Sequence, residues 1–118
     1  MKNRNIVQEK TYAFALKVVK LYRRLALQKQ EREMSRQLLH CGTSIGANVE
    51  EAIGGQSGRD FLAKMSIAYK EAREAHYWLR LLRDSGYIEK DETASFLDDC
   101  EEIMKLTGSI IKTMKTKD

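Results

Sequence analysis

Apolar residues recur at three- and four-residue steps along most of the chain, which is the period of an amphipathic helix. Between residues 5 and 28 the repeating positions are Val7, Phe14, Val18, Leu21 and Leu25. Similar spacing predicts helices at about residues 35–53, 58–84 and 91–114. In the helix at 58–84 the expected apolar stripe is Phe61, Met65, Ala68, Ala72, Ala75, Leu79 and Leu82. No segment alternates with the period of two that a half-buried strand shows. The pattern therefore predicts an all-α protein, a single up-down-up-down four-helix bundle over residues 1–118.

Capping residues and glycines mark the expected helix ends. The expected starts are Ser35, Ser57 with Asp60 three positions later as a partial capping box, and Asp91. The expected stops are Gly54-Gly55, through left-handed backbone, and Gly86. The absence of proline fits long uninterrupted helices.

The last predicted helix carries two apolar stripes. One stripe is Leu97, Cys100, Met104, Thr107, Ile111 and Met114, and the adjacent one is Phe96, Ile103 and Ile110. A single bundle core needs less apolar surface than this, so we expect an oligomer interface to bury the remainder.

The second predicted helix has small residues on its packing side. Gly42 and Gly46 share a stripe with Val49, leaving a notch where another backbone can approach closely. Each glycine costs about 1 kcal/mol relative to alanine, which implies a packing or functional reason. Asn48 lies on the neighbouring stripe with Ile45, where a buried amide would fix the register of the helices.

Composition narrows the class of protein. With 42% hydrophobic and 32% charged residues, the chain reads as a soluble globular domain. No apolar run approaches the ~20 residues of a membrane span, and the first residues do not resemble a secretory signal. Cys41 and Cys100 match no metal or redox spacing, so we expect reduced, buried thiols in a cytoplasmic protein.

Positive charge is concentrated at the start of the chain. Residues 1–40 hold ten Lys and Arg against three acids, whereas residues 81–118 hold six against nine. On a helical wheel one narrow face collects Lys10, Lys17, Lys20 and Arg24, with Arg23 nearby. This face predicts phosphate contacts, and a solvated helix face explains it equally well. A basic front and an acidic back also suit head-to-tail self-association.

The sequence lacks the motifs of the enzyme classes considered for a helical bundle. The GGQSGR segment lacks the strand and the Lys-Ser/Thr of a phosphate loop, although Arg59 beside a helix start could hold an anion. A di-metal bundle needs Glu-x-x-His, but the residues three positions before His40 and His76 are Gln37 and Arg73. The Arg-x4–6-His motif of HEPN-type RNases is also missing.

Paired side chains offer no catalytic site either. Glu50 and Glu51 are adjacent on a helix and point about 100° apart. Neither cysteine has a histidine placed to act as its base. We therefore expect no catalytic residue, no metal and no cofactor.

A run of motifs from Ser44 to Ile88 resembles the bacterial 23S ribosomal RNA intervening-sequence proteins. The run contains Ser-Ile-x-Ala-Asn, a following Glu, Gly-x-x-Ser with Arg nearby, Phe, an Ile-Ala helix with an internal Glu, and a Gly-Tyr turn. These features fall on Ser44, Ile45, Ala47, Asn48, Glu51, Ser57, Arg59, Phe61, Ile67, Ala68, Glu71, Gly86 and Tyr87. The resemblance covers roughly residues 10–113, and it departs at His40, where that family often has Arg.

The resemblance implies a left-handed four-helix bundle that assembles into a homopentameric ring. The accessory variability determinant of diversity-generating retroelements is similar, and it is a basic pentamer that binds nucleic acid and a reverse transcriptase. No enzymatic activity is established for the family, and its ribosomal-protein-like labels derive from gene position.

The leading hypothesis is a non-enzymatic, cytoplasmic homo-oligomer that binds RNA, another nucleic acid or a nucleic-acid-processing protein through basic surface. The rival is a protein–protein scaffold without a nucleic-acid role, in which the basic N-terminal region meets the acidic C-terminal region of a neighbour.

Overall fold

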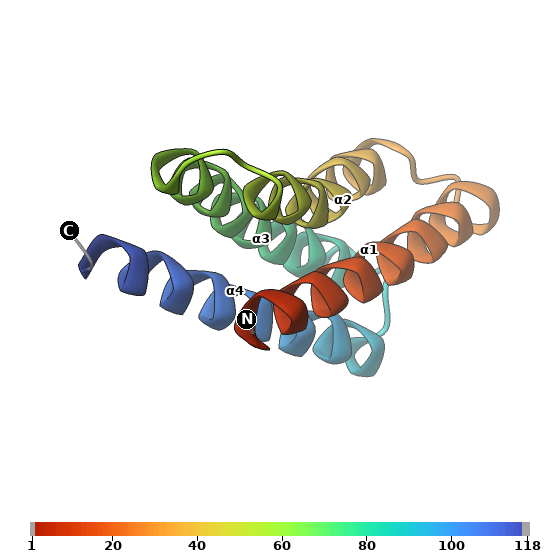
Figure 1. Cartoon of the computed structure of the whole chain (residues 1–118). Helices are drawn as coiled ribbons and strands as arrows, with labels where there is room; N and C mark the ends of the chain where they lie inside the picture. Colours follow the sequence, from red (N-terminus) through yellow and green to blue (C-terminus); the bar gives the residue numbers. More distant parts are fainter. Residues whose placement is uncertain (1, 117–118) are drawn as a thin grey trace.

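Four long helices make up the chain in the computed structural model, which describes the backbone of residues 2–116 and the side chains of residues 6–116. They are α1 (Lys2–Gln28), α2 (Glu33–Ile53), α3 (Gly58–Asp84) and α4 (Lys90–Thr116). Each helix packs on the next, and α1 also packs on α4 (Figure 1). The described residues contain no strand, so the all-α four-helix prediction is confirmed. The observed helix ends lie within three residues of the expected ones.

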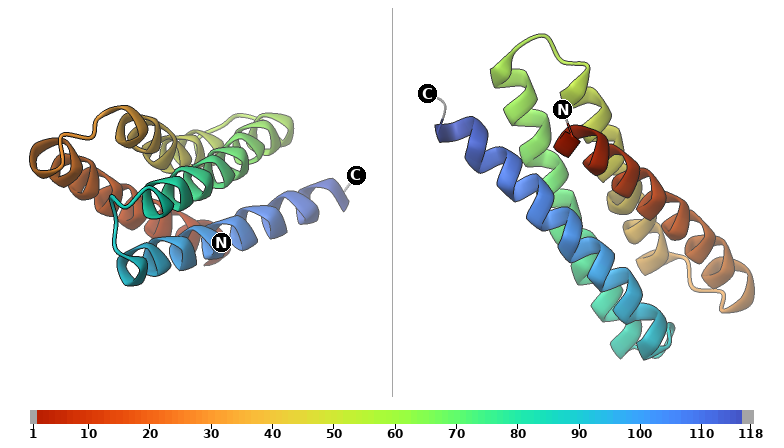
Figure 2. Two further views of the ribbon diagram at one scale, coloured as in Figure 1. Left: turned by 180° about the vertical axis from the view of Figure 1, so that it is seen from behind. Right: turned by 60° about the horizontal axis from the view of Figure 1, so that its bottom comes forward.

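The bundle is elongated, with extents of 48 × 21 × 19 Å. At one end the α2–α3 turn lies near the start of α1, and α4 continues past that start (Figure 2). The α1–α2 and α3–α4 turns occupy the other end.

One continuous apolar core joins the four helices. The expected stripe of α1 is buried, and the buried residues of α3 are those that the periodicity predicts: Phe61, Met65, Ala68, Ala72, Ala75, Leu79 and Leu82. The rings of Phe14 and Phe96 meet edge to face with centroids 6.2 Å apart, which ties α1 to α4. Fully burying a large apolar side chain contributes about 1.5–3 kcal/mol, so this core dominates the stability of the bundle.

The glycines of α2 let α1 approach closely, as the notch predicts. A Cβ at Gly42 would lie 3.0 Å from both Cγ atoms of Val18. A Cβ at Gly46 would lie 3.5 Å from the backbone oxygen of Thr11. The space beside Gly42 is therefore filled by a side chain, and the space beside Gly46 is bordered by backbone.

The register role predicted for Asn48 is wrong. Its side chain is half-buried, and its Nδ2 donates to the backbone oxygen of Ser44 at 2.8 Å and to the Ser44 Oγ at 3.1 Å. Both bonds stay within α2, so the amide does not hold one helix in register against another. An amide four residues after a serine satisfies its own helix first, because the partner is already in place.

The α3–α4 turn ends as expected. Gly86 has φ +87°, its N–H donates to the oxygen of Arg83, and the N–H of Tyr87 donates to the oxygen of Leu82. This is a Schellman motif, in which left-handed backbone satisfies the last carbonyl groups of the helix.

The α2–α3 turn uses its glycines differently from the prediction. Gly54 has φ −82°, and neither it nor Gly55 is left-handed, which corrects the expected stop. Gly55 instead makes room, since a Cβ there would collide with the carboxylate of Asp60. The expected cap at Ser57 is confirmed, because its side chain accepts a hydrogen bond from the N–H of Asp60 at 3.0 Å.

Both apolar stripes of α4 face the bundle. Phe96, Cys100, Ile103 and Thr107 are buried between them. The outer members pack partly buried against the core, as Leu97, Met104, Ile110, Ile111 and Met114. The two stripes therefore form one wide face that packs on the rest of the bundle. Asp91, expected as the cap of this helix, lies inside its first turn.

Candidate nucleic-acid interface

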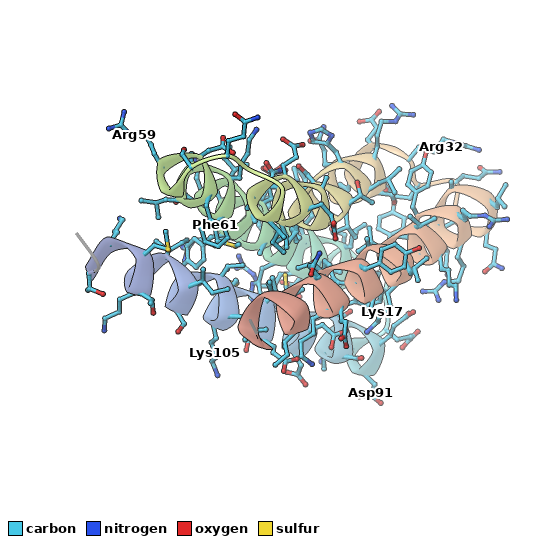
Figure 3. All side chains as sticks on the ribbon, in the orientation of Figure 1. Lys17, Arg32, Arg59, Phe61, Asp91 and Lys105 are labelled. Atoms are coloured by element: carbon cyan, nitrogen blue, oxygen red, sulfur yellow. The ribbon has the colours of Figure 1, made fainter. Side chains whose placement is uncertain are left out.

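The basic face of α1 lies along the seam with α4 rather than facing solvent alone. Among the described side chains, three ion pairs cross this seam: Lys10–Glu102 at 3.2 Å, Lys17–Asp99 at 2.6 Å and Arg24–Glu92 at 2.6 Å. Figure 3 shows Lys17 between the two helices. Half of the cations proposed to contact phosphates are thus already paired within the chain, and the basic N-terminal region meets the acidic α4 intramolecularly.

The geometry of these pairs differs along the seam. Arg24 donates two hydrogen bonds to the carboxylate of Glu92, at 2.6 and 2.8 Å. The hydrogen bond with Glu92 raises the pKa of Arg24. Lys17 also donates to the Oγ of Ser95 at 3.1 Å, and its Nζ lies 4.5 Å from the ring centroid of Phe96. The two parallel hydrogen bonds to Glu92 hold the Arg24 guanidinium firmly, so Arg24 is the least available of the three seam cations for an external phosphate.

Five further cations of the first 40 residues lie in the last turns of α1, in the connection and at the start of α2. Among the described residues no ion pair engages five exposed side chains, which we call the basic end: Lys20, Arg23, Lys29, Arg32 and Arg36. One exposed acid, Glu33, accompanies them within residues 20–36. The basic end therefore carries a net positive charge.

Glu31 shapes the turn that displays these cations. Gln30 has φ 57°, which turns the chain after α1. The Glu31 carboxylate then accepts hydrogen bonds from the N–H groups of Met34, at 3.1 Å, and Ser35, at 2.8 Å. The expectation that Ser35 caps α2 is corrected: Ser35 is buried inside the first turn, and its Oγ donates to the same carboxylate at 2.5 Å.

The ionisation of Glu31 follows from these contacts. Burial acts to raise the pKa of the carboxyl, but the hydrogen bonds from Ser35, Met34 and Glu33 outweigh it, and the net pKa lies below the ordinary 4.5. The carboxylate stays charged at neutral pH and complements the positive end of the helix dipole. The basic end is thus built on a firmly capped turn.

Arg59 lies far from the basic end. Figure 3 shows Arg32 and Arg59 at opposite ends of the bundle. Arg59 is exposed in the first turn of α3, and no ion pair engages it among the described residues. Nearby, Lys64 pairs with Glu51 at 2.8 Å, and this hydrogen bond raises the pKa of Lys64.

The other motif residues serve mainly the fold. Gly42, Ile45 and Phe61 are buried in the core, and Tyr87 packs half-buried against it. Glu71 is half-buried on α3. The geometry gives these residues packing and turn-forming roles.

Side chains suited to catalysis are dispersed. Across the side chains that the structure describes, no three His, Cys, Asp or Glu residues gather closely enough to hold a metal ion. Cys41 and Cys100 are free and buried, as expected. His40 is exposed, whereas His76 bonds to Glu101 at 3.0 Å. Within residues 2–116 no helix combines the length and apolar character that a bilayer span demands.

Sequence reasoning missed Lys29, Arg32 and Arg36. These cations contributed to the charge count of residues 1–40, but a helical wheel for α1 leaves them out because they lie in or beyond the connection. Plotting charge along the chain across the predicted turn would have found them.

The fold and the site together define an all-α four-helix bundle with a charged seam and a basic end. The chain belongs to the 23S rRNA-intervening sequence protein family, whose sequence profile matches residues 3–109. A solved structure from Bacteroides thetaiotaomicron, described as a protein with unknown function from the S23 ribosomal protein family, is 46% identical. It superposes with a TM-score of 0.92, covering 93% of this chain and 98% of that one. No curated protein sequence matches the chain.

Proposed function

We propose that this chain is a non-enzymatic RNA-binding protein of the bacterial cytoplasm, and that its basic end makes the principal contacts with RNA phosphates. The observation that carries the proposal is the set of five exposed cations without ion pairs at the α1–α2 end. Lys and Arg near phosphates release condensed counterions, which drives binding without base-specific readout. The family name, 23S rRNA-intervening sequence protein, supports RNA as the nucleic acid.

The seam cations have a smaller role in this proposal. Lys10, Lys17 and Arg24 would have to leave carboxylates at 2.6–3.2 Å before meeting a phosphate. Lys20 and Arg23, by contrast, are exposed on the same helix, and no ion pair engages either of them among the described residues.

Charge reversal tests the assignment directly. The double variant Arg32→Glu/Arg36→Glu is expected to weaken binding of a labelled structured RNA at least tenfold at about 50 mM salt, measured by fluorescence anisotropy. The matched control Lys90→Glu/Lys112→Glu makes the same charge change at two exposed positions outside the basic end. Equal losses in both variants would argue for a diffuse field instead of a defined surface.

Self-association accompanies this function. Among the described residues, several large apolar side chains are exposed on α1, and three of them share one side of the helix: Tyr12 at 67%, Leu16 at 47% and Leu27 at 75%. Apolar residues so exposed on one side of a helix favour contact with another protein surface. Lys20 and Arg23 lie along the same side, so repeating this helix around a ring would multiply the positive field that RNA meets.

The expected assembly is a homopentameric ring, and its mass tests it. Five chains of 13.6 kDa give about 68 kDa, which light scattering coupled to size-exclusion chromatography resolves from smaller species. A mass near 13.6 kDa at working concentration would contradict self-association while leaving RNA binding by the single chain to be measured.

The competing proposal is a scaffold that binds proteins only. The exposed apolar residues of α1 favour it independently of charge. Indifference of the purified chain to RNA at about 50 mM salt would favour this alternative.

A further inference from the structure

One side of α3, away from the core, alternates aromatic and basic residues. Steps of three and four residues place the following side chains together, and we call them the tyrosine–arginine stripe: Tyr69, Lys70, Arg73, Tyr77 and Arg80. The buried residues of α3 occupy the opposite side. None of the five contributes to the basic end.

The arginines of the stripe lie against its tyrosines. The guanidinium carbon of Arg73 is 6.0 Å from the ring centroid of Tyr69, and that of Arg80 is 5.9 Å from the centroid of Tyr77. Tyr77 is 49% exposed, so its ring remains accessible to a ligand. Among the described residues, no ion pair engages the three cations of the stripe. Arg80 donates hydrogen bonds from Nε to Nδ1 of His76 at 3.1 Å and to the backbone oxygen of His76 at 3.3 Å. Flat rings and cations that form no ion pair therefore lie next to each other.

A groove of about 360 Å³ opens beside Tyr69, along the seam between α3 and α4. Its lining residues are Tyr69, Glu101, Met104, Lys105, Gly108 and Ser109. Gly108 keeps the space open, because a Cβ there would already lie 3.6 Å from Cε1 of Tyr69. The lining acid, Glu101, is bonded to His76 at 3.0 Å. Lys105 projects from α4 into solvent (Figure 3).

This arrangement suits an unpaired nucleotide strand. Every base has a flat face that stacks on an aromatic ring, and stacking combined with backbone-tracking cations is how single strands are held without sequence readout. A duplex keeps its bases stacked on one another, so they are not available to protein rings. Tyr69 and Tyr77 are eight residues apart, about 12 Å along the helix, which a strand of a few nucleotides spans.

We propose that the tyrosine–arginine stripe and its groove bind unpaired nucleotides of RNA. One base packs in the groove beside Tyr69 and another stacks on Tyr77, while Arg73 and Arg80 hold the phosphates between them. The inference rests on the proposed RNA-binding function and specifies its substrate class as single-stranded segments.

Affinity for matched probes tests the inference. A fluorescein-labelled 12-nucleotide oligouridine and a short RNA duplex with a similar number of phosphates are titrated with the full chain at about 50 mM salt. The single strand is expected to bind more tightly. Tyr77→Ala and Gly108→Leu, which fills the groove, are each expected to weaken single-strand binding about fivefold or more and to leave duplex binding unchanged.

Matched variants separate stacking from charge and from misfolding. Tyr77→Phe keeps the ring and is expected to bind like the parent chain. Arg73→Ala is expected to lose more single-strand affinity than Lys90→Ala, which removes an exposed charge elsewhere. Circular dichroism melting verifies that each variant folds, and Tyr77→Ala is an exposed change that decides the outcome if Gly108→Leu does not fold.

The outcomes distinguish this inference from the proposed function. If both RNAs bind equally and neither Tyr77→Ala nor Gly108→Leu changes the affinity, the stripe has no stacking role, although RNA binding itself stands. If neither RNA binds, both proposals are overturned.

Discussion

Glu31 shows how one side chain sets the geometry of a functional surface. It precedes α2, and its carboxylate accepts the first free N–H groups of that helix while being 9% exposed. Arg32 comes immediately after Glu31 in the chain, and Arg36 comes immediately after Ser35, whose N–H donates to the Glu31 carboxylate. Removing the carboxylate would therefore loosen both the helix start and the surface built on it.

Glu31→Ala is expected to lower the free energy of unfolding by about 1–2 kcal/mol, the usual cost of losing a helix cap. Because the folded-state pKa of Glu31 lies below 4.5, this stabilisation is present at neutral pH and is lost as the pH falls through that lower pKa. Urea unfolding at pH 7 and at acid pH checks both parts. Glu33→Ala, an exposed change in the same turn, is the control, and an equal effect of the two variants would contradict the capping role.

The two cysteines should be chemically silent in the folded protein. Burial raises the pKa of Cys41 and of Cys100 to about 12, and only the thiolate is nucleophilic. We expect no reaction with a disulfide reagent at pH 8 under native conditions and reaction of both thiols after unfolding in guanidinium. Rapid modification of either thiol in the native state would show that the core around it opens.

Single-residue predictions from the sequence succeeded where the local chain decides the outcome. Ser57 and Gly86 have their partners within a few residues, and both were identified correctly. Ser35 was misassigned because a glutamate one turn earlier competes for the same N–H groups. The prediction for Gly54 and Gly55 was wrong because a glycine can serve either left-handed backbone or a site without room for a side chain. The sequence alone does not distinguish these two roles.

The contact between α1 and α2 illustrates packing at the scale of whole elements. Gly42 faces the branched side chain of Val18, which is fully buried, and a Cβ at Gly42 would lie only 3.0 Å from both Cγ atoms. Gly46 faces the backbone of Thr11 at an ordinary contact distance. The two glycines therefore differ in what they tolerate, although the sequence places them on one stripe.

Gly46→Ala is expected to leave stability unchanged or raise it by up to about 1 kcal/mol, since alanine favours the helix. Gly42→Ala should be less stable than Gly46→Ala by about 1–2 kcal/mol, because the added methyl group overpacks against Val18. Thermal unfolding of both variants measures the difference. Recovery in Gly42→Ala/Val18→Ala supports the steric cause, and equal stability of the two single variants would contradict it.

Helix period made the elements themselves predictable. The buried residues of α3 match the expected stripe because a 3.6-residue period is written directly in the sequence. The width of the α4 stripe was harder to interpret, since periodicity does not say how many neighbours a helix has. Its two stripes face α3 and α1 around one core, and the exposed large apolar side chains among the described residues lie on α1 and α3.

At the scale of the whole molecule, ion pairs formed on folding neutralise part of the charge asymmetry of the sequence. The basic N-terminal region and the acidic α4 meet at three ion pairs, so the asymmetry visible in the sequence does not all reach solvent. These partners are 68 or more residues apart, and no local pattern announces such a pairing. What remains exposed is the basic end, with the stripe on α3 as a second positive surface.

The salt dependence of RNA affinity tests the central claim, that exposed unpaired cations bind RNA phosphates, most directly. Anisotropy titrations of the parent chain between about 50 and 200 mM salt are expected to give a log–log slope of about −2 to −4, as three to five phosphate contacts predict. Arg32→Glu/Arg36→Glu should make that slope shallower by about one to two. No detectable binding at 50 mM salt, or an affinity that salt does not change, would contradict the claim.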